Sequence, residues 1–83
     1  MTPIEDARNL GPVSGEELRA LGIDTLERLR ELGWQEAWAQ WRERFPERRH
    51  LVAGYALAGA VEDADWRRLP DWLKLEVKRS RRR

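Results

Sequence analysis

Residues 10–29 contain two glycine turns, and each turn leads into a short segment with the signals of a capped helix. In both segments a residue type that caps helix starts stands three positions before a glutamate: Ser14 before Glu17, and Asp24 before Glu27. This spacing forms a capping box, in which two side chains satisfy backbone amides of the first helical turn. The pattern predicts helices over residues 14–21 and 24–32, with a left-handed turn at Gly22 between them.

Residues 34–45 have the clearest amphipathic pattern in the chain. Their apolar side chains recur three or four positions apart, which places them on one face of a helix. They are Trp34, Ala37, Trp38, Trp41 and Phe45. Platforms that stack single-stranded bases expose their rings among basic residues, whereas here the charged residues lie on the opposite face. We therefore expect these tryptophans in the core.

Residues 51–61 contain no charged side chain. A short helix that is apolar on all sides belongs in the centre of a protein, and its small residues let neighbouring helices approach closely. Around it we expect a short first helix over residues 3–8 with Thr2 as its N-cap, a turn capped by Asp65, and a last helix that opens at residue 70 or 71. The expected fold class is all-α: a single small bundle of five to six helices, without strands.

Positive charge is concentrated at the end of the chain. The whole chain has 16 Lys and Arg against 15 Asp and Glu, for a net charge of +1. Five of the positive charges lie in the last six residues: Lys78, Arg79, Arg81, Arg82 and Arg83. Residues 1–77 therefore keep 11 basic against 15 acidic residues, a net charge of −4. Because no apolar residue follows Val77, we expect a folded domain over residues 1–77 and a basic, disordered tail over residues 78–83.

The composition argues against catalysis and metal binding. The chain has no cysteine, a single histidine, and no loop with the spacing of a calcium site. No carboxylate lies in an apolar setting that would tune it for acid–base chemistry. We predict no enzyme activity, no cofactor and no metal, and we place His50 at the start of the central helix. The sequence has no signal-peptide run and no membrane-spanning segment, so we predict a cytoplasmic protein without membrane contact.

The two helices around Gly22 have the arrangement of a helix-hairpin-helix element, which binds phosphates through glycine-rich backbone and the amides of a helix start. Residues 10–18 match the second half of that motif, hydrophobic-Gly-Pro-Lys-x-Ala-x-x-Leu, in spacing. Val13 stands where the lysine often lies, and Glu16 and Glu17 add negative charge that repels a phosphate. Two interpretations stay open: a phosphate site, or a hairpin kept as a folding unit.

If the chain binds DNA, its contacts would come from the hairpin and from the basic tail, through salt-sensitive attraction to phosphates. The candidate contacts near the hairpin are Arg8, Gly11, Val13, Ser14, Gly15 and Arg19. Those in the tail are Lys78, Arg79, Arg81, Arg82 and Arg83. The same basic run also fits a solvated chain end or contact with an acidic partner.

Protein contact is the other class of function. Trp66 and Trp72 are less regularly phased than the other tryptophans, so we expect one of them to be partly exposed as an anchor for a protein partner. Such an anchor predicts an exposed apolar patch, whereas DNA binding requires Arg8, Arg19 and the tail on one side of the hairpin. A homodimer through the last helix is a third interpretation.

Five motifs follow one another along the chain. They are Asn9-Leu10-Gly11-Pro12 with Ser14, Gly22-Ile23 with Thr25, the Leu32-Gly33 boundary, residues 55–60, and Trp66-Arg67-Arg68-Leu69-Pro70. In order and spacing they resemble the C-terminal domain of the TfoX/Sxy family of bacterial competence regulators, over residues 7–75. The resemblance implies an all-helical fold with a helix-hairpin-helix-like N-terminal half, a role in the regulation of DNA-uptake genes, and no catalytic residues.

The resemblance also bears on domain organisation and partners. Full-length members of that family carry an N-terminal α/β domain, and this chain is expected to be a stand-alone C-terminal domain or a fragment. We expect a regulatory module that acts on a protein partner from the competence or transcription machinery. DNA binding through the hairpin and the tail is the alternative.

Overall fold

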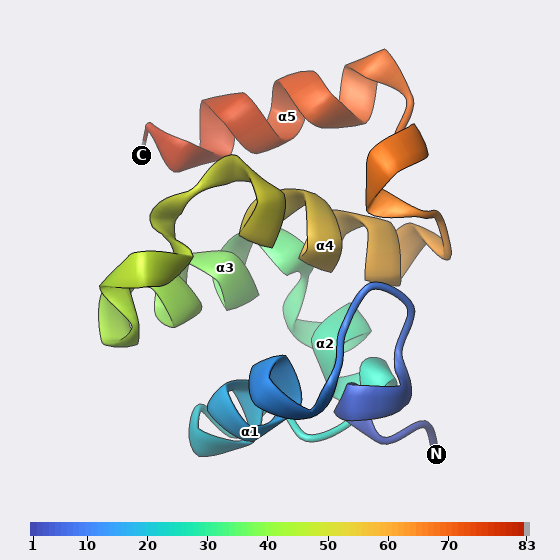
Figure 1. The fold of residues 1–83 in the computed structure, drawn as a ribbon, viewed down its shortest axis with the longest axis vertical. Coiled ribbons are helices and arrows are strands. Elements are labelled where there is room, and N and C mark those ends of the chain that lie inside the picture. Colours follow the sequence, from blue (N-terminus) through green and yellow to red (C-terminus); the bar gives the residue numbers. More distant parts are fainter. Residues whose placement is uncertain (83) are drawn as a thin grey trace.

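The computed structural model describes residues 1–82, and every regular element in that range is helical (Figure 1). The α-helices are α1 (Pro12–Ala20), α2 (Leu26–Leu32), α3 (Trp34–Arg44), α4 (Leu51–Glu62) and α5 (Asp71–Arg81). Three short 3-10 helices accompany them: η1 (Ile4–Asp6), η2 (Pro46–Arg49) and η3 (Trp66–Arg68). The predicted all-α bundle is confirmed.

Helix α4 runs through the middle of the molecule, and the other elements are arranged around it (Figure 1). Helices α3 and α5 both pack against α4. Helix α1 packs against η1 at the far end of the bundle from α5 (Figure 1). The described residues measure 29 × 24 × 20 Å along their principal axes, and α1 and α5 lie toward the two ends of the longest.

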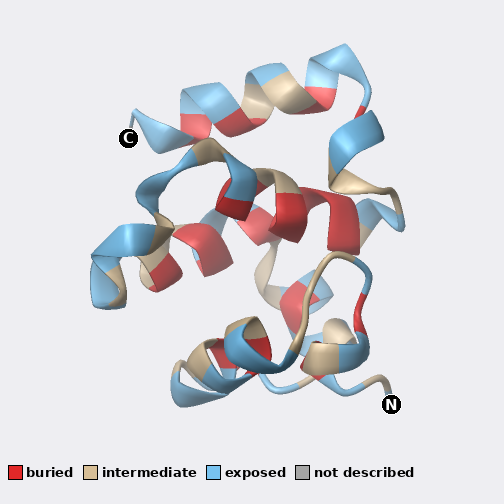
Figure 2. Ribbon diagram, in the orientation of Figure 1, coloured by how far each residue is buried: buried red, intermediate tan, exposed pale blue. Residues whose placement is uncertain are grey.

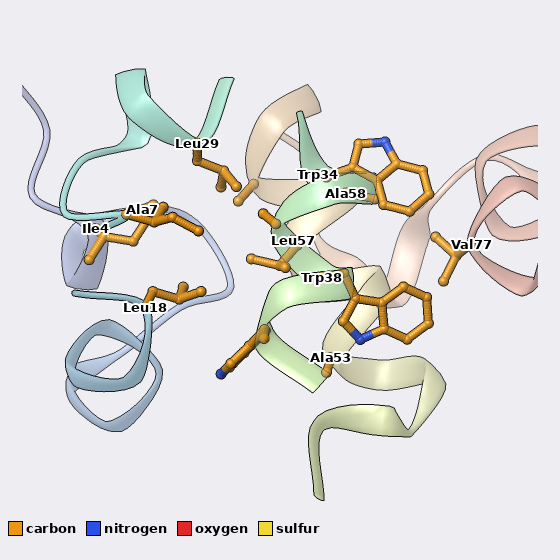
Figure 3. Packing of buried hydrophobic residues seen from close by; sticks show 14 of the residues in the cluster. Ile4, Ala7, Leu18, Leu29, Trp34, Trp38, Ala53, Leu57, Ala58 and Val77 are labelled. Carbon is orange, nitrogen blue, oxygen red and sulfur yellow. The ribbon is translucent and has the colours of Figure 1, made fainter. Parts of the chain in front are cut away.

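The core has two groups of side chains that meet at Leu57 of α4. Figure 3 shows Leu57 between them. One group contains Ile4, Ala7, Leu18 and Leu29, and the other contains Trp34, Trp38 and Val77. The buried residues in Figure 2 are concentrated on α4 and on the helix faces directed toward it. The predicted burial of Trp34, Trp38 and Trp41 is confirmed, because each is at most 6% exposed.

Close packing around α4 depends on glycine at one helix crossing. A Cβ atom on Gly54 would lie 2.7 Å from Cγ1 of Val77 in α5 and 2.8 Å from Cη2 of Trp38 in α3. Both neighbours are fully buried and have little room to move. Gly54 therefore lets α3 and α5 approach α4 closely, as the small residues of this segment predicted.

The hairpin helices begin at residues other than those that the capping boxes predicted. Helix α1 starts at Pro12, with Gly11 as its N-cap, so Ser14 lies inside the first turn. Proline suits the first helical position because it has no amide to satisfy and its φ is already helical. The N-cap of α2 is Thr25, whose hydroxyl accepts a backbone amide at 3.0 Å. The predicted cap, Asp24, lies one residue too early.

The predicted N-terminal helix over residues 3–8 is shorter than expected. Only Ile4–Asp6 is helical, and Thr2 does not cap it. Instead, the backbone of Thr2 bonds to the start of α2. Its amide donates to Oε1 of Glu27 at 2.9 Å, and its carbonyl accepts from the amide of Leu26 at 2.9 Å. These bonds to the hairpin take the place of a longer helix.

Other helix boundaries lie where the sequence analysis predicted them. Gly22 and Gly33 adopt φ angles of +82° and +90°, the left-handed values that end a helix with little strain only in glycine. His50 is the N-cap of α4, and its Nδ1 accepts from the amide of Ala53 at 3.2 Å. Asp65 is the N-cap of η3, as predicted.

Helix α5 continues beyond the expected end of the fold. The sequence predicted a disordered tail from residue 78, but α5 extends to Arg81. Ser80 lies three positions after Val77, and both are buried. The carbonyl of Ser80 accepts from Nη2 of Arg42 in α3 at 3.1 Å. These contacts hold a segment that has no large apolar side chain. Arg83 lies outside the described residues.

Candidate interaction surfaces

The loop that starts α1 presents less backbone than the phosphate hypothesis requires. Gly15 is buried, and its amide donates to the carbonyl of Gly11 at 2.8 Å. A Cβ atom on Gly15 would lie 2.8 Å from Cβ of Glu5, so this glycine serves the packing of α1 against η1. Val13 is exposed and Ser14 is half-buried. These two residues and Gly11 are the predicted loop contacts that lie at the start of α1.

The two arginines near the hairpin contact carboxylates of the chain itself. Nη2 of Arg19 lies 2.6 Å from Oε1 of Glu5, and Nε of Arg19 donates to Oε2 at 3.1 Å. These hydrogen bonds hold the pKa of Glu5 below its ordinary value. Nη1 of Arg8 lies 3.8 Å from Oδ1 of Asp63, in an exposed pair. A phosphate bound at the hairpin would compete with these carboxylates.

The predicted hairpin contacts and tail contacts form two separate groups. Four tail residues are exposed at the end of α5: Lys78, Arg79, Arg81 and Arg82. Figure 1 places the end of α5 and the start of α1 on different parts of the molecule, with α4 between these helices. The remaining candidate, Arg83, lies outside the described residues. The hairpin and the tail therefore do not join into one continuous patch within residues 1–82.

Asn9 ties the loop before α1 to the C-terminal end of α4. Its φ is +73°. Its Nδ2 donates to the carbonyls of Ala64 (2.8 Å) and Ala56 (3.3 Å), and its Oδ1 accepts from the amide of Trp66 at 3.1 Å. A Cβ atom on Gly59 would lie only 2.5 Å from this Nδ2. Gly59 therefore leaves the space through which the Asn9 side chain reaches α4.

Helix α5 exposes an apolar pair of side chains. Trp72 is 60% exposed, and Leu75, three positions later, is 48% exposed. The exposed side continues toward the C-terminus with basic residues three or four positions on, which places them on the same face of the helix. We call this face the α5 surface; it consists of Trp72, Leu75, Lys78, Arg79 and Arg82. It is apolar at one end and basic at the other, where Nη1 of Arg79 donates to Oε1 of Glu76 at 3.2 Å.

Trp66, the other predicted anchor, is less accessible. Its ring is half-buried, and the guanidinium of Arg67 lies 5.9 Å from the ring centroid. Its backbone amide is held by Asn9. Of the two tryptophans considered as anchors, Trp72 therefore has the larger part of its side chain in solvent.

A partly buried ion pair joins the hairpin to the rest of the bundle. Glu17 of α1 accepts from Nε and Nη2 of Arg48 in η2, at 2.8 and 3.1 Å. It also accepts from Nε1 of Trp41 in α3 at 2.8 Å. Hydrogen bonds from Arg48 and then from Trp41 lower the pKa of Glu17, against the opposing effect of burial. Sequence analysis assigned Glu17 to a capping box, and no local pattern identifies partners 24 and 31 positions away.

Two kinds of feature are absent from residues 1–82. No group of three or more His, Asp or Glu side chains is placed to hold a metal ion there. Within the same range, no helix combines the length and the apolar character needed to cross a membrane.

Comparison with known proteins agrees with the fold described above. Residues 1–80 match the family model for the TfoX C-terminal domain. The chain belongs to this family. The crystal structure of an uncharacterized protein from Listeria monocytogenes, in a triclinic form, is similar with a TM-score of 0.87 and 30% sequence identity. The match covers 93% of this chain and 86% of the Listeria chain. No match was found among curated proteins.

The motif residues of this TfoX C-terminal domain have clear structural roles. Asn9 connects the first loop to α4 and η3, and Gly22 supplies the turn between α1 and α2. Pro12 opens α1. The predicted resemblance to the TfoX C-terminal domain over residues 7–75 is confirmed, and the match extends to residues 1–80.

Proposed function

We propose that this TfoX C-terminal domain is a cytoplasmic, non-catalytic module of competence or transcription regulation that binds a protein partner through the α5 surface. Membership of the family supports a competence-related regulatory role. The observation that carries the proposal is the exposure of Trp72 and Leu75 together on one face of α5.

The apolar end of the α5 surface is suited to anchor a partner. Aromatic side chains such as Trp72 bury about 150–250 Å² each and dominate the energetics of many interfaces. Tryptophan is also enriched among the residues whose truncation weakens binding most. The neighbouring basic residues favour a partner with complementary charge, because like charges across an interface are repelled. The expected partner surface is therefore apolar beside an acidic segment.

The test uses two matched substitutions, Leu75→Lys and Val52→Lys. Both side chains are exposed to a similar extent, 48% and 43%, and Val52 lies in α4, outside the α5 surface. A photo-crosslinking residue in place of Asp71, which is exposed next to Trp72, identifies the partner in the host while the apolar pair stays intact, and calorimetry then measures the dissociation constant of the partner. We expect Leu75→Lys to weaken binding by at least about tenfold and Val52→Lys to have little effect.

Competence-gene expression in the host supplies a second measurement for the same pair of variants. We expect expression to fall with Leu75→Lys and to stay near the wild-type level with Val52→Lys. Equal effects of the two substitutions on both affinity and expression would contradict a role for the α5 surface.

DNA binding is the second candidate function, and the basic end of the α5 surface is the observation that favours it. Fluorescence anisotropy of a labelled duplex at about 50 and 200 mM salt measures this binding. Lys78→Glu with Arg82→Glu removes basic contacts without shortening α5. Gly11→Asp adds negative charge at the start of α1, where aspartate is a good N-cap and there is open space.

The pattern of effects distinguishes the two candidates. Binding that is weakened by Gly11→Asp supports a phosphate site at the hairpin. Binding that depends only on Lys78 and Arg82, and falls steeply with salt, indicates charge attraction without a defined site. If the wild-type chain does not bind the duplex at either salt concentration, DNA binding is rejected and protein contact is favoured.

A further inference from the structure

A hollow of about 440 Å³ lies between α3, η2 and the end of α5. Its lining consists of Ala39, Arg42, Glu43, Arg49 and Arg81. Three guanidinium groups from three different elements thus border one space, and Glu43 is the one carboxylate among the described lining residues. Among the described residues of this lining, three side chains are positive and one is negative. This hollow is separate from the α5 surface, none of whose residues lines it.

Arg42 is the most firmly held of the three arginines. Its guanidinium lies 4.7 Å from the centroid of the Trp38 ring, and its Nη2 donates to the carbonyl of Ser80 at 3.1 Å. Burial lowers the pKa of Arg42, but an arginine remains protonated at physiological pH. The bond to Ser80 also occupies one carbonyl near the C-terminal end of α5, where partial negative charge would otherwise repel an anion.

Arg49 and Arg81 are exposed at the rim of the hollow. Within residues 1–82, neither has a carboxylate at ion-pair distance, in contrast to Arg19 and Arg48. The guanidinium groups of Arg49 and Arg81 therefore form no direct ion pair with another described residue. An anion that entered the hollow would gain hydrogen bonds from them without first breaking an ion pair.

We propose that this hollow binds a small phosphate monoester, held by Arg42, Arg49 and Arg81. The planar guanidinium group donates paired hydrogen bonds to phosphate oxygens. A monoester near neutral pH carries close to two negative charges and offers three terminal oxygens to the guanidinium groups, whereas each diester of a DNA backbone carries one charge and offers two such oxygens. The volume falls within the roughly 300–1,000 Å³ typical of small-molecule sites, so space remains for the group that bears the phosphate.

Titration of the full chain tests the proposal. The probes are adenosine 5′-monophosphate, adenosine and inorganic phosphate, added at constant ionic strength, with amide NMR shifts as the readout. We expect roughly millimolar dissociation constants for both phosphates and no binding of adenosine. The largest shifts are expected at the lining residues. Equal binding of adenosine and its monophosphate, or no binding of either phosphate, would overturn the proposal.

Two double substitutions separate a defined site from a general positive field. Arg49→Glu with Arg81→Glu changes the lining, and Arg44→Glu with Arg82→Glu makes the same change in net charge at exposed positions outside the lining. We expect the first pair to weaken binding of the monophosphate by at least about tenfold and the second by less than about threefold. Circular dichroism verifies that both variants remain folded.

Equal weakening by the two double substitutions would reject the hollow as a site and indicate non-specific charge. Binding of a DNA duplex that is tighter than that of adenosine 5′-monophosphate at the same salt concentration, and that is lost with Arg49→Glu and Arg81→Glu, would also overturn the proposal. In that case the arginines would serve a nucleic-acid surface instead of a small-molecule site.

Discussion

Asn9 and Asp63 are both non-glycine residues with positive φ, at +73° and +55°, but their surroundings differ. The side chain of Asn9 makes three hydrogen bonds to the backbone at the end of α4 and the start of η3. Asp63 is the exposed C-cap of α4, and its carboxylate lies 3.8 Å from Arg8. The left-handed conformation costs an L residue about 1–2 kcal/mol, which glycine avoids. Comparison of the two positions therefore distinguishes the contribution of the Asn9 side chain from that of the left-handed backbone conformation.

Replacement of each residue by glycine tests that separation. Asn9→Gly is expected to lower the free energy of unfolding by about 2–4 kcal/mol, because three hydrogen bonds at a partly buried site are lost. Asp63→Gly is expected to stay within about 1 kcal/mol of the wild type. Urea denaturation measures both values. Similar values for the two variants would show that Asn9 is needed only for its backbone conformation.

The central helix α4 depends on two glycines for different contacts. Gly54 admits the side chains of Trp38 and Val77, whereas Gly59 admits Asn9 and the carbonyl of Ala64. Glycine inside a helix costs about 1 kcal/mol relative to alanine. The close approach of α3, α5 and the first loop offsets this loss of helix propensity. The two glycines therefore lower the helix propensity of α4, and close packing offsets that loss.

Gly54→Ala is expected to lower the free energy of unfolding by about 1–3 kcal/mol, because the added methyl group overlaps fully buried side chains. Val77→Ala removes one of these neighbours and leaves a cavity of its own. We therefore expect the double variant to lose less stability than the sum of the single variants. Urea denaturation of the wild type, the two single variants and the double variant gives the coupling free energy between positions 54 and 77. Simple additivity would contradict the contact between Gly54 and Val77.

The ion pair between Glu17 in α1 and Arg48 in η2 links two elements that are far apart in the sequence. Their side chains are only 16% and 21% exposed. The pKa of Glu17 is lowered from its ordinary value of 4.5, so the folded protein binds the proton less readily than the unfolded chain. The pair therefore stabilises the fold fully above about pH 4.5, and this stability is lost as the pH falls through the lowered pKa.

Glu17→Gln is expected to lower the free energy of unfolding at pH 7 by about 1–3 kcal/mol. The difference from the wild type is expected to shrink below pH 4.5, because the wild-type carboxylate then becomes protonated. Thermal or urea denaturation between pH 7 and 3 measures this change. The adjacent exposed residue supplies the control, since Glu16→Gln should leave stability nearly unchanged at both ends of the range. A constant difference between Glu17→Gln and the wild type would contradict the ion pair.

Local periodicity was sufficient to predict most of the fold. The tryptophan spacing in α3 and the uncharged run in α4 reflect burial on one face and on all sides, which are strong and local signals. The predicted N-cap was wrong by three residues for α1 and by one residue for α2, because Pro12 and Thr25 compete with Ser14 and Asp24 as boundary residues. The order of α5 up to Arg81 was also missed, because it rests on contact with α3.

The interaction surfaces were less predictable than the fold. Sequence analysis named Trp66 and Trp72 together. Which of the two is more exposed depends on which face of α5 packs against the core, and the structure shows that it is Trp72. The arginine-lined hollow combines residues from α3, η2 and α5 that are up to about forty positions apart. No local pattern brings such residues together, because their proximity follows from the packing of whole helices.

The uneven burial of the tryptophans has an optical consequence. Trp34, Trp38 and Trp41 are shielded from water, while most of Trp72 is in contact with it. Indole fluorescence moves to longer wavelength as the ring becomes hydrated. Unfolding would therefore shift the emission toward the red, whereas a partner that covers Trp72 would shift it toward the blue. One spectrum of the unlabelled chain thus reports loss of the fold and occupation of the α5 surface as changes of opposite sign.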